Sequence, residues 1–298
     1  MEDKIEKEPT SSWDLVINSS SNSKAINWKE LIRYKDLMML FVKRDFIALY
    51  KQTVLGPIWV VIQPILTTIT FFIVFTKIAT IDTGGIDPIL FYMLGVTIWA
   101  YFSDCVVKTS DTFILNQSIF GKVYFPRLIV PLSLIITNLI KLGIQFTLFV
   151  VVYLFYAFVI GFKEVPNVEI AGASWQIALI PVLILILAAL GLGIGLIISG
   201  LTTKYRDLRF LIQFGIQLMM YATPVVWPLK NVPVEYRDLA ALNPMAGVLE
   251  TFKAAFFGEQ NALFNWYYLG YSALFAIVVL FIGIKLFSRV EKSFIDTV

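Results

Sequence analysis

The sequence predicts an all-α membrane protein with six transmembrane helices. Three observations support this fold class. Of the 298 residues, 58% are hydrophobic and only 15% are charged, whereas soluble domains average about 45–50% and 25%. The apolar residues form long continuous runs, and the charged residues lie between them. A transmembrane β-barrel would instead show alternating segments of about ten residues, so helices are the better interpretation.

Six stretches are long and apolar enough to cross about 30 Å of hydrocarbon, which takes roughly 20 residues. The third is long enough to tilt or kink. The second carries Asp104 near its end, and the fifth is short before Pro224. The expected spans are 54–79, about 89–107, 128–160, 175–201, about 210–226 and 264–287.

The positively charged residues predict how the chain is oriented. Lys and Arg gather in the segments 29–51, 108–127, 204–209 and 285–292. The opposite side holds fewer of them, namely Lys77, Lys163, Lys230, Arg237 and Lys253. Since loops rich in Lys and Arg stay in the cytoplasm, we expect both termini to be cytoplasmic.

The segments around the spans complete the expected domain organisation. Residues 1–26 are polar and predict a disordered cytoplasmic tail, and 27–52 mix apolar with basic residues, as an amphipathic interface helix does. Asn27 is its expected N-cap, with Glu30 three residues on. This helix either anchors the chain or forms a platform for a cytoplasmic partner. A six-span domain, 53–290, and a cytoplasmic tail, 291–298, follow.

The outer segment between the fifth and sixth spans, about 227–261, is too long for a tight turn. It contains Pro228, Pro233 and Pro244, followed by a mildly apolar run over 245–257. That run is too short and too charged to span. We therefore expect one or two short re-entrant helices, whose backbone ends would need to be covered by protein.

The sequence lacks the residues of common catalytic and metal sites. It has no histidine and one cysteine, Cys105, so no metal site is expected. It has no phosphate-binding loop motif, so we expect no nucleotide hydrolysis by this chain. Its net charge of +3 is dispersed, which argues against nucleic-acid binding. Glycines within the fourth span predict close helix packing; these are Gly191, Gly193, Gly195 and Gly200.

Five motifs occur in one order along the chain. They are Arg44–Trp59 followed by Gln63-Pro64, Phe120–Pro131, Tyr205–Leu208, Pro224–Pro228 and Asn243–Ala246. Together they resemble the ABC-2 type polysaccharide exporter permeases, most closely the O-antigen and teichoic-acid exporters.

The resemblance implies a homodimer that binds two copies of a separate ATPase subunit. The ATPase would bind the ATP and Mg. The substrate would be a glycan or polyol phosphate on undecaprenyl pyrophosphate, moved across the bacterial inner membrane through a channel at the dimer interface. O-antigen is the favoured polymer, with teichoic acid and capsule as alternatives.

Force from the ATPase would enter through cytoplasmic elements, and residues 116–121 are expected to form a short coupling helix. The coupling candidates are Arg44, Asn116, Phe120, Tyr124, Arg206 and Asp207. The aromatic members, together with Phe125, are alternatively anchors in the headgroup layer. Arg206 and Asp207 alternatively stabilise a tight turn.

A channel for sugars needs aromatic faces that stack on pyranose rings. The candidates are Trp59, Phe71, Phe72 and Phe75 in the first span, and Phe210, Phe214 and Tyr221 in the fifth. Alternatively they face lipid or pack. The outer gate candidates are Trp227, Arg237 and Asn243.

Lys141 lies within the third span and shares one helix face with Asn138 and Gln145. A charge near the bilayer centre is costly, so Lys141 should face protein or water. It either attracts the pyrophosphate of the substrate, binds backbone carbonyls, or reaches the headgroup layer.

Two other function classes compete with the exporter. A secondary transporter usually has internal repeats and charged pairs in its spans, and the sequence indicates neither. A membrane enzyme acting on lipid-linked sugars would have clustered acids or histidines. Asp104 and Asp111 are the only close acidic pair near a span end.

Overall fold

The computed structural model describes residues 28–51, 53–160, 174–203, 205 and 207–295, and every regular element among them is a helix. Five helices within these residues are long and apolar enough to cross a membrane. They are Gly56–Ile78, Pro88–Ser110, Ile129–Phe158, Trp175–Thr202 and Trp266–Glu291. The all-α class and five of the six expected spans are therefore confirmed.

The chain order is as follows. The α-helices are α1 (Trp28–Arg33), α2 (Lys35–Tyr50), α3 (Trp59–Phe71), α4 (Pro88–Ser110), α5 (Thr112–Leu115), α6 (Gln117–Phe120), α7 (Ile129–Phe155), α8 (Ile180–Thr202), α9 (Leu208–Tyr221), α10 (Val234–Ala241), α11 (Pro244–Phe257) and α12 (Trp266–Ile295). The π-helical segments η2 (Phe72–Ile78) and η3 (Tyr156–Ile160) extend α3 and α7, and the 3₁₀ turn η4 (Trp175–Leu179) precedes α8. Short 3₁₀ turns η1 (Gly56–Ile58) and η5 (Leu229–Asn231) precede α3 and α10.

The expected interface helix consists of two helices, α1 and α2, which meet at Tyr34. α2 packs on α7. Its Phe41 and Val42 are buried, while Met39 and Leu40 remain exposed. The tail 1–26 and the expected cap Asn27 lie outside the described residues.

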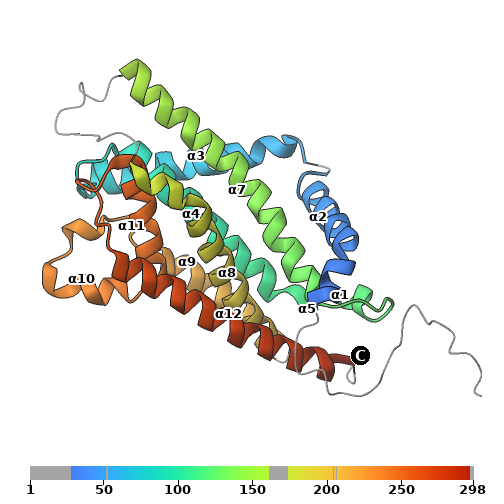
Figure 1. The fold of residues 1–298 in the computed structure, drawn as a ribbon. Coiled ribbons are helices and arrows are strands. Elements are labelled where there is room, and N and C mark those ends of the chain that lie inside the picture. The colour runs from blue at the N-terminus through green and yellow to red at the C-terminus, as the bar shows by residue number, and fades with distance from the viewer. Residues whose placement is uncertain (1–27, 52, 161–173, 204, 206, 296–298) are drawn as a thin grey trace, which may run out of the picture.

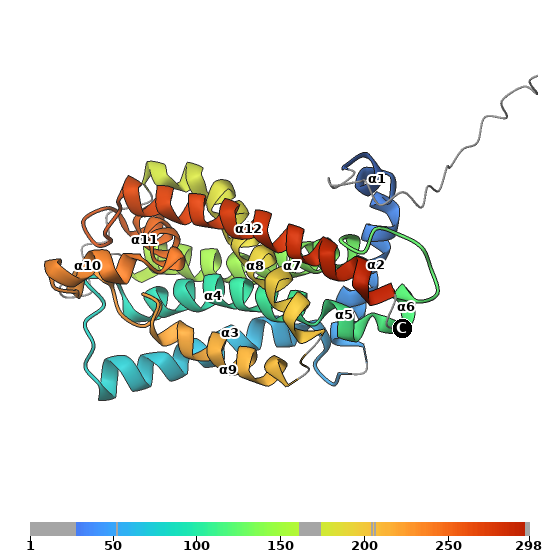
Figure 2. The same ribbon diagram turned by 90° about the horizontal axis from the view of Figure 1, so that it is seen from below.

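α4 is the central helix of the bundle, packed against α3, α7, α8 and α9 (Figures 1 and 2). Asp87 caps its first turn by accepting hydrogen bonds from the backbone N–H groups of Ile89 and Leu90. Pro88 follows at the first helical position, where its missing N–H is not needed. Most side chains of α4 are buried on every side, so the second predicted span lies inside protein and has little surface for lipid.

Glycines bring α8 into close contact with both of its neighbours, as the sequence predicted. A Cβ atom on Gly191 would lie 2.5 Å from Cβ of Cys105 on α4. One on Gly193 would lie 2.6 Å from the backbone nitrogen of Leu280 on α12. Real Cβ atoms do not tolerate such distances, so only glycine allows these helices to approach so closely.

The two ends of the bundle carry different elements. α1, α2, α5, α6 and the C-terminal part of α12 lie at one end, which we call the α5 end (Figures 1 and 2). α10 and α11 lie at the other, which we call the α11 end. At the α5 end, Arg127 donates a backbone hydrogen bond to the Glu291 carboxylate and a guanidinium hydrogen bond to the Glu291 carbonyl oxygen. This contact joins the loop after α6 to α12.

The fifth predicted span differs from the expectation. α9 has 14 residues, or about 21 Å at 1.5 Å per residue, which is less than the hydrocarbon thickness. It ends at Tyr221, three residues before Pro224, because the residue that precedes a proline, here Thr223, disfavours helical geometry. Length alone therefore gives five spans within the described residues.

The predicted outer segment contains two short helices, α10 and α11, and every residue of α11 is buried. Lys253 of α11, counted above among the outer loop charges, is buried with Glu250 in an ion pair of 2.9 Å. Lys253 also donates to the Pro224 carbonyl oxygen at 2.6 Å, and Glu250 accepts from the Leu263 backbone N–H at 3.0 Å. The pair therefore joins α11 to the turn after α9 and to the segment before α12.

Replacing Gly283 of α12 by alanine tests the close packing. The new Cβ atom would lie 2.5 Å from the Gly193 carbonyl oxygen, so we expect the variant to lose about 1–3 kcal/mol of stability. Gly270→Ala on the same helix is the matched control, because no atom lies within 4 Å of its Cβ position. Denaturant unfolding in detergent measures both, and equal losses would contradict the packing account.

Candidate functional site

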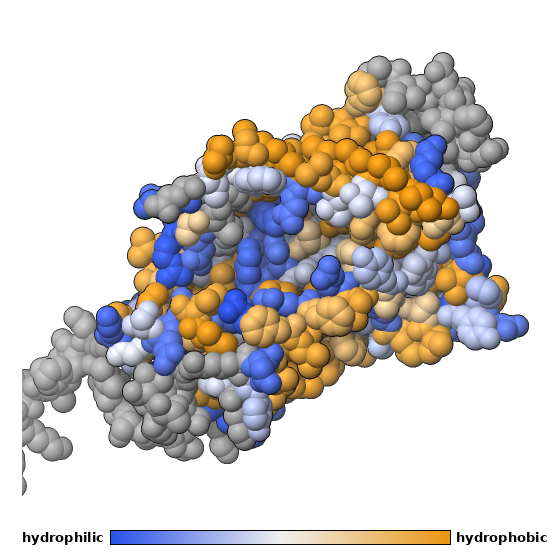
Figure 3. Space-filling view, turned by 180° about the vertical axis from the view of Figure 1, so that it is seen from behind, coloured by the Kyte–Doolittle hydropathy of each residue, from blue (hydrophilic) through white to orange (hydrophobic). Residues whose placement is uncertain are grey.

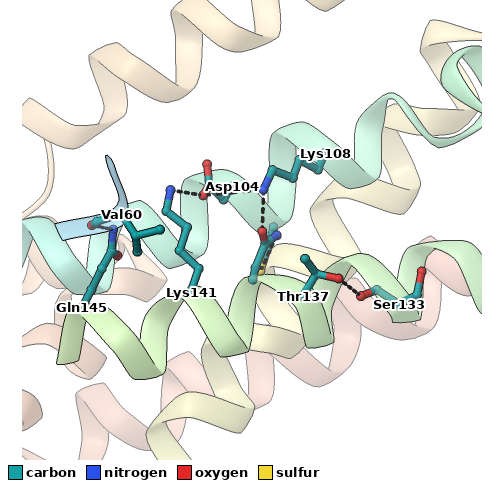
Figure 4. A network of polar contacts seen from close by, with 9 residues as sticks. Val60, Asp104, Lys108, Ser133, Thr137, Lys141 and Gln145 are labelled. Atoms are coloured by element: carbon teal, nitrogen blue, oxygen red, sulfur yellow. Dashed lines mark hydrogen bonds and ion pairs between the residues drawn. The ribbon is translucent and has the colours of Figure 1, made fainter. Parts of the chain in front are cut away.

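A charged cluster joins α4 to α7 within two of the spans (Figure 4). The Lys141 ammonium group lies 2.8 Å from the Asp104 carboxylate, and Lys108 lies 3.9 Å from the same oxygen atom. Lys108 also donates a hydrogen bond of 2.7 Å to the side-chain oxygen of Asn138. The side chains of Lys141, Lys108 and Asp104 are 17%, 28% and 29% exposed, so each remains partly accessible.

This cluster corrects the sequence analysis, which indicated no charged pair within the spans. Asp104 and Lys141 are 37 residues apart in the chain, so no local motif joins them. One signal was present: the second and third spans each carried a charge that required a partner. Asp104 and Asp111, considered above as an acidic pair, each bind a different cation, Lys141 and Arg209.

The predicted polar face of α7 is confirmed. Its third member, Gln145, supplies a hydrogen bond to a backbone carbonyl group that lacks its usual helical donor. Pro64 lies inside α3 and has no N–H to donate to the Val60 carbonyl oxygen four residues before it. The Gln145 amide of α7 donates to that oxygen at 3.1 Å instead (Figure 4). All three groups are buried, and lipid offers no alternative donor.

The predicted channel aromatics fall into two groups. Phe210, Phe214 and Tyr221 occupy one face of α9, and all three are exposed. In the first span Trp59 is exposed, Phe71 is buried, and Phe72 and Phe75 are half-buried. Only Phe75 and Tyr221 bring the two groups together, with ring centroids 6.5 Å apart.

α3 and α9 lie on one side of the bundle, on the face turned away from the viewer in Figure 1 (Figures 1 and 2). Seen from that side, the surface is hollowed, and hydrophilic residues lie between two apolar bands (Figure 3). The same face therefore combines exposed aromatic side chains with polar surface at the level of the spans.

The coupling candidates at the α5 end differ in exposure. Phe120 is buried in a cluster of five phenylalanines, whereas Tyr124 is 72% exposed. The cluster, which we call the phenylalanine cluster, joins α2, α5, α6, the following loop and α12; it consists of Phe41, Phe113, Phe120, Phe125 and Phe287.

The polar coupling candidates lie nearby. Asn116 is buried, donates to the Thr112 carbonyl oxygen and accepts a long hydrogen bond of 3.5 Å from Arg44. Asp207 is exposed and precedes α9. Arg206 lies outside the described residues.

One ion pair at the α5 end was not anticipated. Arg209 at the start of α9 lies 2.8 Å from Asp111 at the start of α5. Burial raises the pKa of the Asp111 carboxyl above its ordinary value, and the nearby Arg209 opposes that shift. Next to this pair, the Thr202 hydroxyl donates to the Ser110 carbonyl oxygen at 2.9 Å. The end of α4 is thus joined to both α8 and α9.

The three gate candidates at the α11 end all donate hydrogen bonds within or next to the outer segment. The Trp227 indole donates to the Tyr221 carbonyl oxygen, and Arg237 donates to the carbonyl oxygens of Val232 and Lys230. Asn243 caps α11 and donates to the Thr223 hydroxyl at 2.8 Å. Asn243 thus joins the start of α11 to the turn after α9, whereas Arg237 joins α10 to the segment just before it. A gating role stays a prediction.

Comparison with known proteins decides the family. The family model described as ABC-2 type transporter matches residues 36–257. The chain belongs to the ABC-2 type transporter family. The ABC-2 match runs from α2 to the end of α11, so it includes the α4–α7 charged cluster, the phenylalanine cluster except Phe287, and the outer segment up to α11.

Relatives of known description cover almost the whole ABC-2 chain. An O-antigen export system permease protein of Klebsiella pneumoniae is 25% identical over 261 residues, 88% of this chain and 94% of the relative. One of Myxococcus xanthus is 24% identical, covering 91% and 98%. A polysialic acid transport protein of Escherichia coli is 22% identical, covering 82% and 89%.

Gln145→Leu tests whether α7 supplies the hydrogen bond that Pro64 removes from α3. The variant leaves the Val60 carbonyl oxygen without its donor, so we expect a loss of about 1–3 kcal/mol. In a Pro64→Ala background the backbone N–H of residue 64 can donate to Val60, and the same substitution should be less harmful. Unfolding of all four proteins measures the coupling, and strictly additive losses would contradict it.

Proposed function

We propose that this chain is the membrane subunit of an ATP-driven exporter of lipid-linked polysaccharide in the bacterial inner membrane. The observation that carries the proposal is the near full-length match to O-antigen export permeases. The favoured cargo is an O-antigen chain carried on undecaprenyl pyrophosphate. Capsule polysaccharide is the second candidate, since a capsule polysaccharide export inner-membrane protein of Neisseria meningitidis is 20% identical over 268 residues.

Two copies of the chain would form the channel between them. The face that carries α3 and α9 is the best candidate for its wall. It offers exposed aromatic rings for stacking on sugars, and it is hollowed and hydrophilic between apolar bands (Figure 3). A polymer that must keep moving needs such a surface, because stacking binds without fixing one sugar in place.

α9 would provide a sixth crossing in spite of its length. Its first turn contacts Asp111 at the α5 end, and Thr223, just after its last turn, contacts Asn243 at the α11 end. The helix therefore reaches from one end of the bundle to the other. We place the α5 end, with both termini, in the cytoplasm, because most Lys and Arg residues lie in its segments.

A separate ATPase, which binds the ATP and Mg, would dock at the α5 end. Leu115, Val123 and Tyr124 are exposed there. Directly behind them the phenylalanine cluster packs α5 and α6 against α2 and α12. Movement imposed on the loop by the ATPase would thus be passed to two long helices by contact between rigid rings.

Reconstitution tests the function as a whole. The chain and its ATPase are placed together in proteoliposomes that contain an undecaprenyl-linked glycan, and movement of the glycan across the bilayer is measured. We expect export only with both subunits and hydrolysable ATP. Export by this chain in the absence of the ATPase would contradict the proposal.

Tyr124→Ala tests the docking surface. Loss of an exposed aromatic anchor should weaken ATPase binding about tenfold or more, as at interface hot spots, while the stability of the protein stays unchanged. Tyr267→Ala is the control, since Tyr267 is equally well exposed but lies on α12, just after the outer segment. ATPase copurification and binding titration in detergent measure the effect, and equal affinities for both variants would refute the assignment.

Cysteine labelling tests the channel wall. Phe214 of α9 is 58% exposed and Leu185 of α8 is 67% exposed, whereas the native Cys105 is buried. In membranes, a membrane-impermeant maleimide should label Phe214→Cys several-fold faster than Leu185→Cys, which would face lipid. Equal rates at the two positions would place α9 outside the channel.

A further inference from the structure

We propose that Lys108 and Lys141, which share the Asp104 carboxylate, form a binding site for a phosphate or pyrophosphate anion at the level of the membrane. The inference deepens the proposed function and rests on it for the origin of the anion, which would be the headgroup of the lipid-linked substrate.

The cluster carries an excess of positive charge. Two lysines share one carboxylate, since both ammonium groups approach the same oxygen of Asp104, at 2.8 and 3.9 Å. The neighbouring Arg44 and Asp45 neutralise each other in an ion pair of 2.7 Å. Among the side chains that the structure describes, one positive charge is therefore left over between α4 and α7. An excess charge within a span is costly unless a partner or water compensates it, and such residues usually have a function.

A purely structural ion pair would need only one lysine. Asp104 and Lys141 already join α4 to α7. The nearest partner of Lys108 is the neutral amide oxygen of Asn138 at 2.7 Å, and that amide in turn donates to the Cys105 sulfur atom. Asn138 orients the Lys108 ammonium group but does not neutralise it.

The positions of the two ammonium groups suit a shared anion. Because both ammonium groups lie within hydrogen-bonding or ion-pairing distance of one carboxylate oxygen, they are close enough to bind different oxygen atoms of a single anion. A phosphate or pyrophosphate anion replaces Asp104 as the shared partner and carries more acceptor oxygens than a carboxylate. When no anion is bound, Asp104 is the internal counter-ion of the site.

The cluster is accessible to an anion. The three side chains are each partly exposed. Lys108 and Asp104 lie two and six residues before Ser110, the last residue of α4, which is roughly 3 and 9 Å from its α5 end. α4 also packs against α3 and α9, the helices of the hollowed face. An anion therefore reaches the site from the α5 end.

Two substitutions with opposite expected effects test the site. Lys108→Gln removes the excess charge and leaves the Asp104–Lys141 pair intact, so we expect it to weaken anion binding at least tenfold. Asp104→Asn removes the internal counter-ion, so it should tighten binding several-fold. Lys285→Gln is the matched control, because Lys285 lies on another span, over the ring of Phe281. Full-length protein in phosphatidylcholine nanodiscs is used throughout, and the melting temperature of each variant without ligand reports its folding.

Three probes separate the sources of the anion: inorganic pyrophosphate in solution, undecaprenyl pyrophosphate in the nanodisc, and phosphatidylglycerol in the nanodisc. Ligand-dependent shifts in melting temperature give the apparent affinities. Binding of either pyrophosphate probe with opposite responses of the two variants supports the site, and the lipid arm decides whether the headgroup is the source. Binding of neither probe, changes of the same sign in both variants, or an equal response to phosphatidylglycerol would overturn it. Since these measurements need no ATPase, failed export in the reconstituted system would count against the proposed function alone.

Discussion

Three helices of this protein approach one another closely because glycine stands where they cross. Lipid tails are as apolar as leucine, so the bundle gains little from hiding apolar surface and depends on close packing instead. Gly193 of α8 and Gly283 of α12 place two backbones in contact, and Gly191 and Gly195 leave room on α8 for the side chains of Cys105 and Thr109 of α4. With these helices fixed, α4 becomes a buried central element, and its polar side chains can face other parts of the chain.

The same solvent explains where the polar contacts occur. Lipid supplies no hydrogen-bond partners, so each break in a helix has to be satisfied from within the protein. Gln145 satisfies the carbonyl group that Pro64 leaves free in α3, and the Glu250–Lys253 pair holds α11 against the turn after α9. Such contacts keep irregular segments in place between the long helices. Segments joined by such a contact are held to each other.

The two ends of the bundle differ in how they are held. At the α5 end, buried rings of the phenylalanine cluster connect the short helices to α2 and α12, and the Arg209–Asp111 pair connects them to α9. At the α11 end, hydrogen bonds to backbone carbonyl groups hold the outer segment. Under the proposed function, a push at the α5 end would be passed to α9, and from α9 to the contact between Thr223 and Asn243. This chain of contacts is a physical route by which an ATPase cycle would reach the outer segment.

Composition and the length of the apolar runs determined the fold class and five of the spans, because crossing hydrocarbon imposes a residue count that sequence displays directly. The glycines of α8 and the polar face of α7 were also readable, since both follow helical periodicity. The tertiary structure alone decided that Phe120 is buried while Tyr124 is exposed. It alone paired Asp104 with Lys141 and Arg209 with Asp111, because partners from different helices meet only once the bundle has set their distance. The polar cluster at the centre of the proposed anion site is therefore a product of packing, and no stretch of sequence contains it.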